Sequence, residues 1–255
     1  MANTLPLQAL IFDVDGTLAD TERDGHRVAF NHAFEEAGLA WDWSVELYGE
    51  LLRVTGGKER INHYLDTYLP HFTPKAPRDA FVKGLHEAKT RHYTELLGKG
   101  EIPLRPGVAR LIQEAREAGL KIAIATTTTP ANVEALIVNT LGADAMQWFA
   151  VIGAGDIVPA KKPAADIYDY VLQQLGLDAS HCIAFEDSYN GIRSSRGAQL
   201  TTLVATNDYT LQDDFSGAAL VVNHWGEPDL PFTVAAGDAH GACCVTLELL
   251  QQLRN

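Results

Sequence analysis

The chain has 255 residues, of which 46% are hydrophobic and 21% are charged, as in an ordinary globular protein. Its 20 Lys and Arg against 33 Asp and Glu give a formal net charge of −13, which argues against broad nucleic-acid binding and against an anionic membrane as a partner. No stretch approaches the roughly 18 apolar residues of a membrane span, and the three cysteines form no CxxC pair, so a disulfide framework and a structural zinc site are both disfavoured.

The first predicted element is a buried strand over residues 8–12 (QALIF), a short apolar run that ends at a carboxylate. From about residue 20 to residue 103 the pattern is helical. Stretches such as RVAFNHAFEEAG and DAFVKGLHEAKTRHYTELLG place apolar residues three and four positions apart, and no convincing strand interrupts them.

From about residue 104 amphipathic helices alternate with short apolar strands. The predicted helices are GVARLIQEAREAG, PANVEALIVNTLG, ADIYDYVLQQLG and NGIRSSRGA, and the predicted strands are KIAIAT, FAVIGAG, HCIAFED, LTTLVAT and ALVV. The tail is less regular, because AGDAHGACC is loop-like and VTLELLQQL fits either a strand or a short helix.

This alternation predicts an α/β fold with a Rossmann-like parallel sheet covered on both faces by helices. One strand alone is not stable, so the strand at residues 8–12 belongs to the same sheet. We therefore expect a core made of residues 1–19 and 104–230, an inserted helical domain at 20–103, and an extension at 231–255 packed on the core.

Polar side chains stand where the predicted strands end, and ligands bind beyond the carboxyl ends of parallel strands. These residues are Asp13, Asp15, Thr126, Glu186 and Asp187, together with Lys162 just before the predicted helix IYDYVLQQL. An Asp at a strand end is often only a turn residue, but so many together suit a hard divalent cation and a phosphoryl group.

In chain order the motifs DVDGT, T, KKP and ED resemble the four signature motifs of the haloacid dehalogenase superfamily, over nearly the whole chain. One departure is Ala165, which stands where the family commonly has a second proline after the lysine. The resemblance implies that the inserted helices are the cap domain of one branch of that superfamily, and that the chain is a phosphoric monoester hydrolase.

The resemblance also implies roles for the core residues. Asp13 matches the nucleophile that forms an aspartyl-phosphate, and Asp15 matches the general acid and base. Asp13, the main-chain carbonyl of Asp15, and Asp187 are expected to hold Mg²⁺, with Glu186 behind them. Thr126 and Lys162 are expected to bind phosphoryl oxygens, and Thr127 is a further candidate for substrate contact.

Two segments of the predicted cap are candidates for substrate binding. Glu22 and His26 are four residues apart and share one face of a helix, although the same stretch also fits a plain capped helix start. Gly57, Lys58 and Arg60 open another helix and suit an anion, although they also fit an interhelical turn with solvated charges.

The segments DGTLADTERDGHRVAFN, WDWSVELYGELL and TGGKERI resemble the CbbY family of haloacid dehalogenase phosphatases, whose members act on xylulose-1,5-bisphosphate, an inhibitory misfire product of Rubisco. The resemblance implies that one phosphate binds at Asp13 and Mg²⁺, and we expect the other at Gly57, Lys58 and Arg60. We further hypothesise that binding of this remote phosphate closes the cleft between core and cap.

Two alternatives remain open at this point. A sugar-phosphate mutase of the β-phosphoglucomutase kind shares the core motifs but returns the phosphoryl group to the sugar. A non-catalytic binding protein on the same fold is the alternative from another class. We expect a monomer in a bacterial cytoplasm, with a chloroplast stroma as the second setting, and no nucleic-acid or membrane partner.

Overall fold

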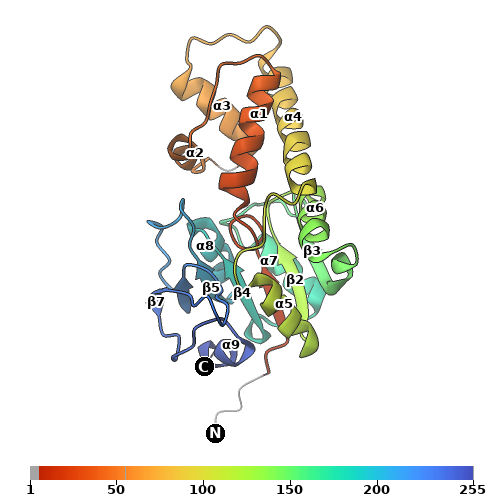
Figure 1. Ribbon diagram of the computed structural model, residues 1–255, viewed down its shortest axis with the longest axis vertical. Helices are drawn as coiled ribbons and strands as arrows, with labels where there is room; N and C mark the ends of the chain where they lie inside the picture. The colour runs from red at the N-terminus through yellow and green to blue at the C-terminus, as the bar shows by residue number, and fades with distance from the viewer. Residues whose placement is uncertain (1–5, 55, 255) are drawn as a thin grey trace. The chain divides into compact units, whose positions relative to one another are not determined.

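The computed structural model describes residues 6–54 and 56–254 (Figure 1). The chain divides into two compact units, the first made of Met1–Asp20 and Pro103–Asn255 and the second of Thr21–Ile102. The sequence placed the insertion at 20–103, so its predicted limits differ from these by one residue at each end.

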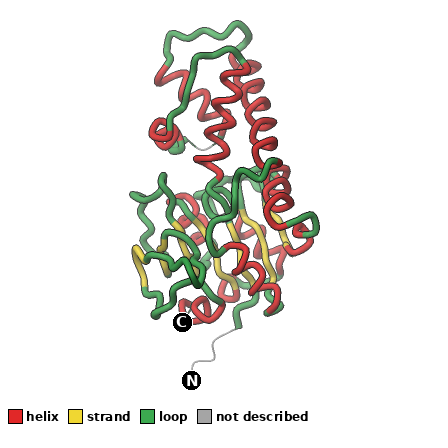
Figure 2. Tube along the Cα trace, viewed as in Figure 1, coloured by secondary structure: helices red, strands yellow, loops and turns green. Residues whose placement is uncertain are grey.

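The first unit contains a seven-stranded sheet in the order β3-β2-β1-β4-β5-β6-β7, and every neighbouring pair is parallel except β6 and β7. The strands are drawn in yellow in Figure 2. The strands are β1 (Ala9–Phe12), β2 (Lys121–Ala125), β3 (Phe149–Gly153), β4 (Cys182–Glu186), β5 (Thr201–Ala205), β6 (Leu220–Val222) and β7 (Val234–Gly237). The predicted α/β fold class is confirmed.

The helices of this unit cover the sheet and explain why its central strands are apolar. They are α5 (Val108–Glu117), α6 (Pro130–Leu141), α7 (Asp166–Leu175), α8 (Tyr189–Gly197) and α9 (Leu247–Leu253), with short 3₁₀ turns η2 (Ala145–Trp148) and η3 (Ala179–His181). All four residues of β1 are buried. Ile11 packs with Val171 of α7, whereas Phe12 stacks on Phe185 of β4 with the ring centroids 4.4 Å apart. A strand buried on both faces needs an apolar residue at every position.

The C-terminal segment takes part in the sheet itself. Strand β7 is antiparallel to β6 and forms the edge of the sheet, although all four of its residues are exposed. The ambiguous stretch VTLELLQQL forms helix α9, which begins after Thr246 and contacts α5.

The second unit is helical, and Figure 2 shows no strand among its described residues. Its elements are the π-helical turn η1 (Glu22–His26) and helices α1 (Arg27–Glu36), α2 (Val45–Leu51), α3 (Gly57–Tyr68) and α4 (Arg78–Gly98). Helix α1 packs along α4, and buried rings including Phe30 and Trp43 form much of the core. Within the described part of the chain, no helix is long and apolar enough to cross a membrane.

Candidate active site

The loop after β1 turns sharply and presents two carboxylates. Asp13 continues the strand, and its amide donates to the Phe185 carbonyl at 3.0 Å. Gly16 has φ +82°, and a Cβ at this position would collide with the carboxylate of Asp187. Only glycine therefore fits a turn that brings the backbone this close to the neighbouring strand end.

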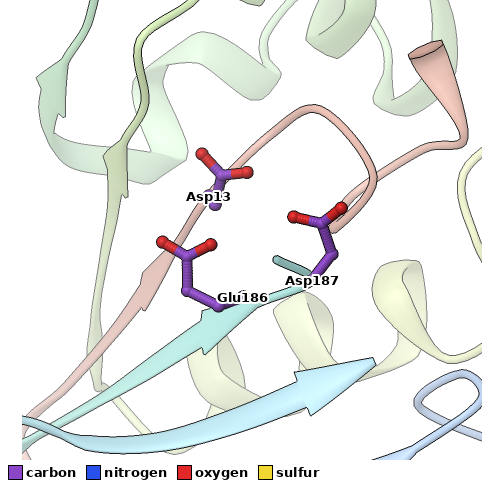
Figure 3. A group of neighbouring side chains, drawn as sticks. All are labelled: Asp13, Glu186 and Asp187. Atoms are coloured by element: carbon purple, nitrogen blue, oxygen red, sulfur yellow. The ribbon is translucent and has the colours of Figure 1, made fainter. Parts of the chain in front are cut away.

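Three carboxylates meet beyond β1 and β4. Asp13, Glu186 and Asp187 are buried, and each offers one oxygen within 4.8 Å of the others (Figure 3). They come from strands that are neighbours in the sheet, so their carboxyl ends lie at the same edge. The structure thus brings together three of the residues that the sequence predicted for the metal site.

Lys162 lies against the same carboxylates. Its Nζ donates to Asp13 Oδ1 at 2.7 Å and to Glu186 Oε1 at 2.6 Å. The hydroxyl of Tyr168, on α7, also donates to Glu186 Oε1 at 2.5 Å. The ammonium and the phenol together hold Glu186 in place and keep Lys162 beside Asp13.

The charges in this cluster do not balance. Burial raises the pKa of Asp13 to about 7, an effect that Lys162 opposes and Glu186 strengthens. Burial also raises the pKa of Asp187 well above its usual value, and the neighbouring Asp13 adds to that rise. Burial alone would lower the pKa of Lys162, but Asp13 and Glu186 outweigh it and raise that pKa. One ammonium faces three carboxylates, so the site has an excess of negative charge.

This donor set fits a magnesium ion. Among the described residues, Glu186 Oε2 is buried without a hydrogen-bond partner, which is costly unless another group binds it. Hard divalent cations prefer carboxylate and carbonyl oxygens, and a charge of +2 would offset the excess negative charge of the three carboxylates. The oxygen-only set is unsuited to zinc in its usual nitrogen and sulfur sites.

The other predicted core residues lie at the same edge of the sheet. Thr126 follows β2 and is buried, and its Oγ1 accepts from the Thr128 amide at 3.3 Å. Thr127 and Asp15 are partly exposed, and the charge of Asp15 contributes to the raised pKa of Asp13. Asp15 is therefore close enough to Asp13 for the two to influence each other electrostatically.

In the second unit, Glu22 and Arg60 share Tyr48. The Tyr48 hydroxyl donates to Glu22 Oε2 at 2.6 Å and accepts from Arg60 Nη1 at 2.9 Å. Arg60 is buried and also donates to the carbonyls of Leu51 and Val54. The structure therefore places the Arg60 guanidinium inside this unit's packing.

His26 lies in a different group from Glu22. Its Nδ1 is 2.8 Å from Nζ of the buried Lys89, and its ring is tilted against Tyr93 with the centroids 4.0 Å apart. An ammonium is only a donor, so in this contact Nδ1 is the acceptor. Glu22 and His26 are the first and last residues of the π-helical turn η1, and their hydrogen bonds go to Tyr48 and Lys89 respectively.

Cationic groups gather near the start of α3. Lys58 is exposed in its first turn, and a Cβ on Gly57 would come within 2.7 Å of the His86 ring. Burial together with Lys89 and Lys58 lowers the pKa of His86 from 6.5 to about 4. The two ammonium groups of Lys58 and Lys89, together with Gly57 and the neutral ring of His86, are called the cationic cluster below.

The sequence did not point to several of these groups. The groups that it missed belong to no local motif, because their partners lie 12 or more residues away in the chain or on another helix. They are Tyr48, His86, Lys89 and Tyr168. A tyrosine or histidine at helical spacing looks like a core residue until its partner is known.

The chain is similar to known proteins over most of its length. A family model described as haloacid dehalogenase-like hydrolase matches residues 7–199. Protein CbbY of Cupriavidus necator is 52% identical over 225 residues, which is 88% of each chain.

Two solved structures are similar over most of the chain. A CbbY variant from Rhodobacter sphaeroides in complex with xylulose-(1,5)bisphosphate is 43% identical, with a TM-score of 0.77 over 86% of this chain and 94% of that one. A putative β-phosphoglucomutase from Thermotoga maritima is 26% identical, with a TM-score of 0.65 over 84% of this chain and 94% of that one.

Proposed function

The chain belongs to the CbbY family of haloacid dehalogenase-like hydrolases, and from this premise we propose that it is a Mg²⁺-dependent phosphatase of xylulose-1,5-bisphosphate. The observation that carries the proposal is the buried cluster of Asp13, Lys162, Glu186 and Asp187. The bisphosphate bound to the Rhodobacter sphaeroides relative supports this choice of substrate.

The proposed reaction has two steps at phosphorus. The Asp13 carboxylate attacks, a bond forms between its oxygen and phosphorus, and the bond from phosphorus to the sugar oxygen breaks while Asp15 gives that oxygen a proton. Water then attacks the phosphorus, Asp15 takes a proton from the water, and the bond to Asp13 breaks. Lys162, which already donates to Asp13, offsets negative charge on the phosphoryl oxygens.

Asp13, Asp187 and the main-chain carbonyl of Asp15 are the groups that we assign to Mg²⁺, with Glu186 supporting them. When bound there, the ion supplies positive charge opposite the phosphoryl oxygens. Thr126 and Thr127, at the end of β2, are the proposed hydroxyl contacts for the same oxygens.

The cationic cluster is the proposed site of the second phosphate. The first-turn amides of α3 and the Lys58 ammonium both attract anions, and the N-cap residue Gly56 has no side chain of its own to occupy those amides. Arg60 was expected to bind the second phosphate, but its guanidinium donates to the Tyr48 hydroxyl and to the carbonyls of Leu51 and Val54. We therefore do not assign it to the phosphate. We assign it to holding Tyr48 and, through it, Glu22, while Glu22 and His26 are the proposed contacts for the sugar.

Phosphate release from a panel of substrates tests the proposal. The panel is xylulose-1,5-bisphosphate, ribulose-1,5-bisphosphate, phosphoglycolate and β-glucose 1-phosphate, each with Mg²⁺ and with EDTA. We expect Mg²⁺-dependent release with a strong preference for the xylulose compound, and none from Asp13→Asn.

Other outcomes support the alternatives. Conversion of β-glucose 1-phosphate to glucose 6-phosphate without phosphate release would assign the chain to the mutases. Binding of the sugar phosphates without turnover of any of them would leave a non-catalytic binding protein.

The CbbY relative in Cupriavidus necator supports placing the activity in a bacterial cytoplasm, where it would protect Rubisco from an inhibitor.

A further inference from the structure

Arg105 is a buried arginine just before α5, and its guanidinium binds backbone oxygens from three separate segments. Nη1 donates to the carbonyls of Gly16 and, at 2.9 Å, Ala205, and Nη2 donates to those of Thr206 at 2.5 Å and Asn223 at 2.6 Å. Nε lies 3.4 Å from Asp20 Oδ1, and the Arg105 amide donates to the Leu18 carbonyl at 2.8 Å. Every terminal N–H of the side chain therefore has a backbone acceptor.

Two of these segments lead directly to residues of the proposed metal site. Gly16 follows Asp15, whose main-chain carbonyl is an assigned ligand. Thr206 precedes Asn207, whose Nδ2 donates to Asp187 Oδ2 at 2.7 Å. The Asn207 amide is itself oriented, because its Oδ1 accepts from the Tyr209 backbone amide at 2.9 Å.

The two segments also touch each other beside the metal site. A Cβ on Gly16 would lie 2.8 Å from Asn207 Nδ2 and would collide with Asp187. Any shift of Gly16 relative to Asn207 would change where Asp187 can lie.

An arginine in this place needs a reason. Burying a charge is costly, and Asp20, the carboxylate that pairs with Arg105, has a side chain that is 51% exposed. Lysine would keep the charge but has three hydrogens on one nitrogen, which do not reach acceptors spread around a planar fork. Arginine is therefore needed here for the planar arrangement of its N–H donors and not for its charge.

We propose that Arg105 and Asn207 are positioning residues for the metal site: Arg105 fixes the turn after Asp15 to the loop after β5, and Asn207 orients Asp187. The inference rests on the proposed function, since it concerns the affinity of the proposed Mg²⁺ site. Neither residue touches the reacting atoms.

The first test is Arg105→Lys, with Mg²⁺ binding measured by calorimetry in the absence of substrate. We expect the dissociation constant for Mg²⁺ to rise about 10- to 100-fold, as for other residues that orient metal ligands. We also expect kcat to fall at a fixed Mg²⁺ concentration, with part of it recovered by added Mg²⁺, and the KM for substrate at saturating Mg²⁺ to change little.

Arg110→Lys is the matched control. Arg110 also binds a carbonyl, that of Gly226 at 2.9 Å, and pairs with Glu227 at 3.1 Å, but it contacts neither Gly16 nor the loop after β5. It should lower thermal stability and leave Mg²⁺ affinity unchanged. If Arg105→Lys also lowers only stability, Arg105 is a structural residue and the proposal is wrong.

Asn207→Ala keeps the proposal testable if Arg105→Lys does not fold. It removes the donor to Asp187 and leaves the acceptors of Arg105 in place, and Asn207 is partly exposed, so folding should persist. Wild-type Mg²⁺ affinity in Asn207→Ala would overturn its role. A wild-type protein that binds no Mg²⁺ would overturn the proposed function as well, whereas normal wild-type binding with unaffected variants would overturn the positioning role alone.

Discussion

Among the residues that the structure describes, Lys162 is the only ammonium bonded to the buried carboxylates of Asp13 and Glu186, so its removal should lower stability even without substrate. In Lys162→Met, Asp13 and Glu186 lose the donor that each binds at 2.6–2.7 Å. Leaving buried carboxylates without their cationic partner costs about 3 kcal/mol, which corresponds to a melting temperature lower by roughly 10 °C in EDTA at pH 8. Thermal unfolding followed by circular dichroism measures this.

Lys161→Met is the matched control, because the neighbouring Lys161 pairs at 2.8 Å with Asp156, whose side chain is 88% exposed. Exposed pairs contribute little, so this variant should melt close to wild type. Equal melting temperatures for the two variants would contradict the account of the buried cluster.

His86 gives the chain a dependence on acid pH. Its pKa in the folded state is about 4 and its usual value is 6.5, so the unfolded chain binds a proton more readily than the folded one between these values. The stability that depends on neutral His86 is fully present above pH 6.5 and is lost as the pH falls toward 4. Lys89, Lys58 and His26 oppose its protonation, and Glu59 favours it.

We therefore expect His86→Gln to lose less stability than wild type when the pH falls from 6.5 to 4. Melting temperatures measured across that range test this. Lys58→Met removes one of the cations that lower the pKa of His86, so its curve should move part of the way toward that of His86→Gln. Parallel curves for wild type and His86→Gln would show that His86 is not the group responsible.

At the scale of single residues, the sequence predicted the side chains that stand at strand ends. Asp13, Glu186 and Asp187 could be placed together because parallel strands bring their carboxyl ends to one edge. Tyr168 and Asn207 could not be predicted, because each acts through a hydrogen bond to a residue on a different element.

Among the elements of the second unit, η1, α2 and α3 are joined through one hydroxyl. Tyr48 on α2 links Glu22 of η1 to Arg60 of α3. Tyr48→Phe removes both hydrogen bonds and leaves Glu22 less well oriented. If Glu22 binds the sugar, the KM for xylulose-1,5-bisphosphate should rise about 10-fold with a smaller change in kcat, since a hydrogen bond to a charged group contributes about 1.5 kcal/mol.

Tyr68→Phe is the control for this prediction. Tyr68 donates to Glu50 Oε2 at 2.8 Å, which is the same chemistry at an exposed position. Its KM should stay at the wild-type value when steady-state rates are compared. A rise in KM shared by both variants would point to a general loss of packing instead of a substrate contact.

Helices and strands could be predicted where the spacing of apolar residues was clear. They could not be predicted where a segment is a strand only because it pairs with a neighbouring strand. Helix α4 (Arg78–Gly98) and strand β4 follow directly from their patterns. Strand β7 does not, because VAAG is exposed throughout and shows no alternation. It is a strand because β6 offers it hydrogen bonds, which is a contact between segments that no local pattern reveals.

For the molecule as a whole, the two units carry opposite kinds of charge at their candidate sites. The first unit gathers carboxylates around Asp13, and the second gathers cations around Lys58. The sequence predicts the insertion of one unit within the other, because a purely helical pattern of apolar residues interrupts the alternation of strands and helices. The predicted closure of a cleft on phosphate binding stays a prediction.

A substrate with two phosphates should therefore depend on Lys58 more than a substrate with one. Lys58→Ala should raise the KM for xylulose-1,5-bisphosphate about 10-fold or more and change turnover of a small monophosphate little, because a charged hydrogen bond to phosphate is lost. Lys83→Ala, an exposed lysine on α4 that pairs only loosely with Glu87 at 3.7 Å, is the control. Equal losses on both substrates would remove Lys58 from the phosphate site.

The most direct test of the central claim is a rapid-quench single turnover with xylulose-1,5-bisphosphate labelled at phosphorus, in the presence of Mg²⁺. The account predicts that label first appears on the peptide containing Asp13 and then leaves as inorganic phosphate. Label that reaches phosphate without ever appearing on that peptide would contradict the aspartyl-phosphate. Label that returns from the protein to a sugar would contradict the phosphatase and indicate a mutase.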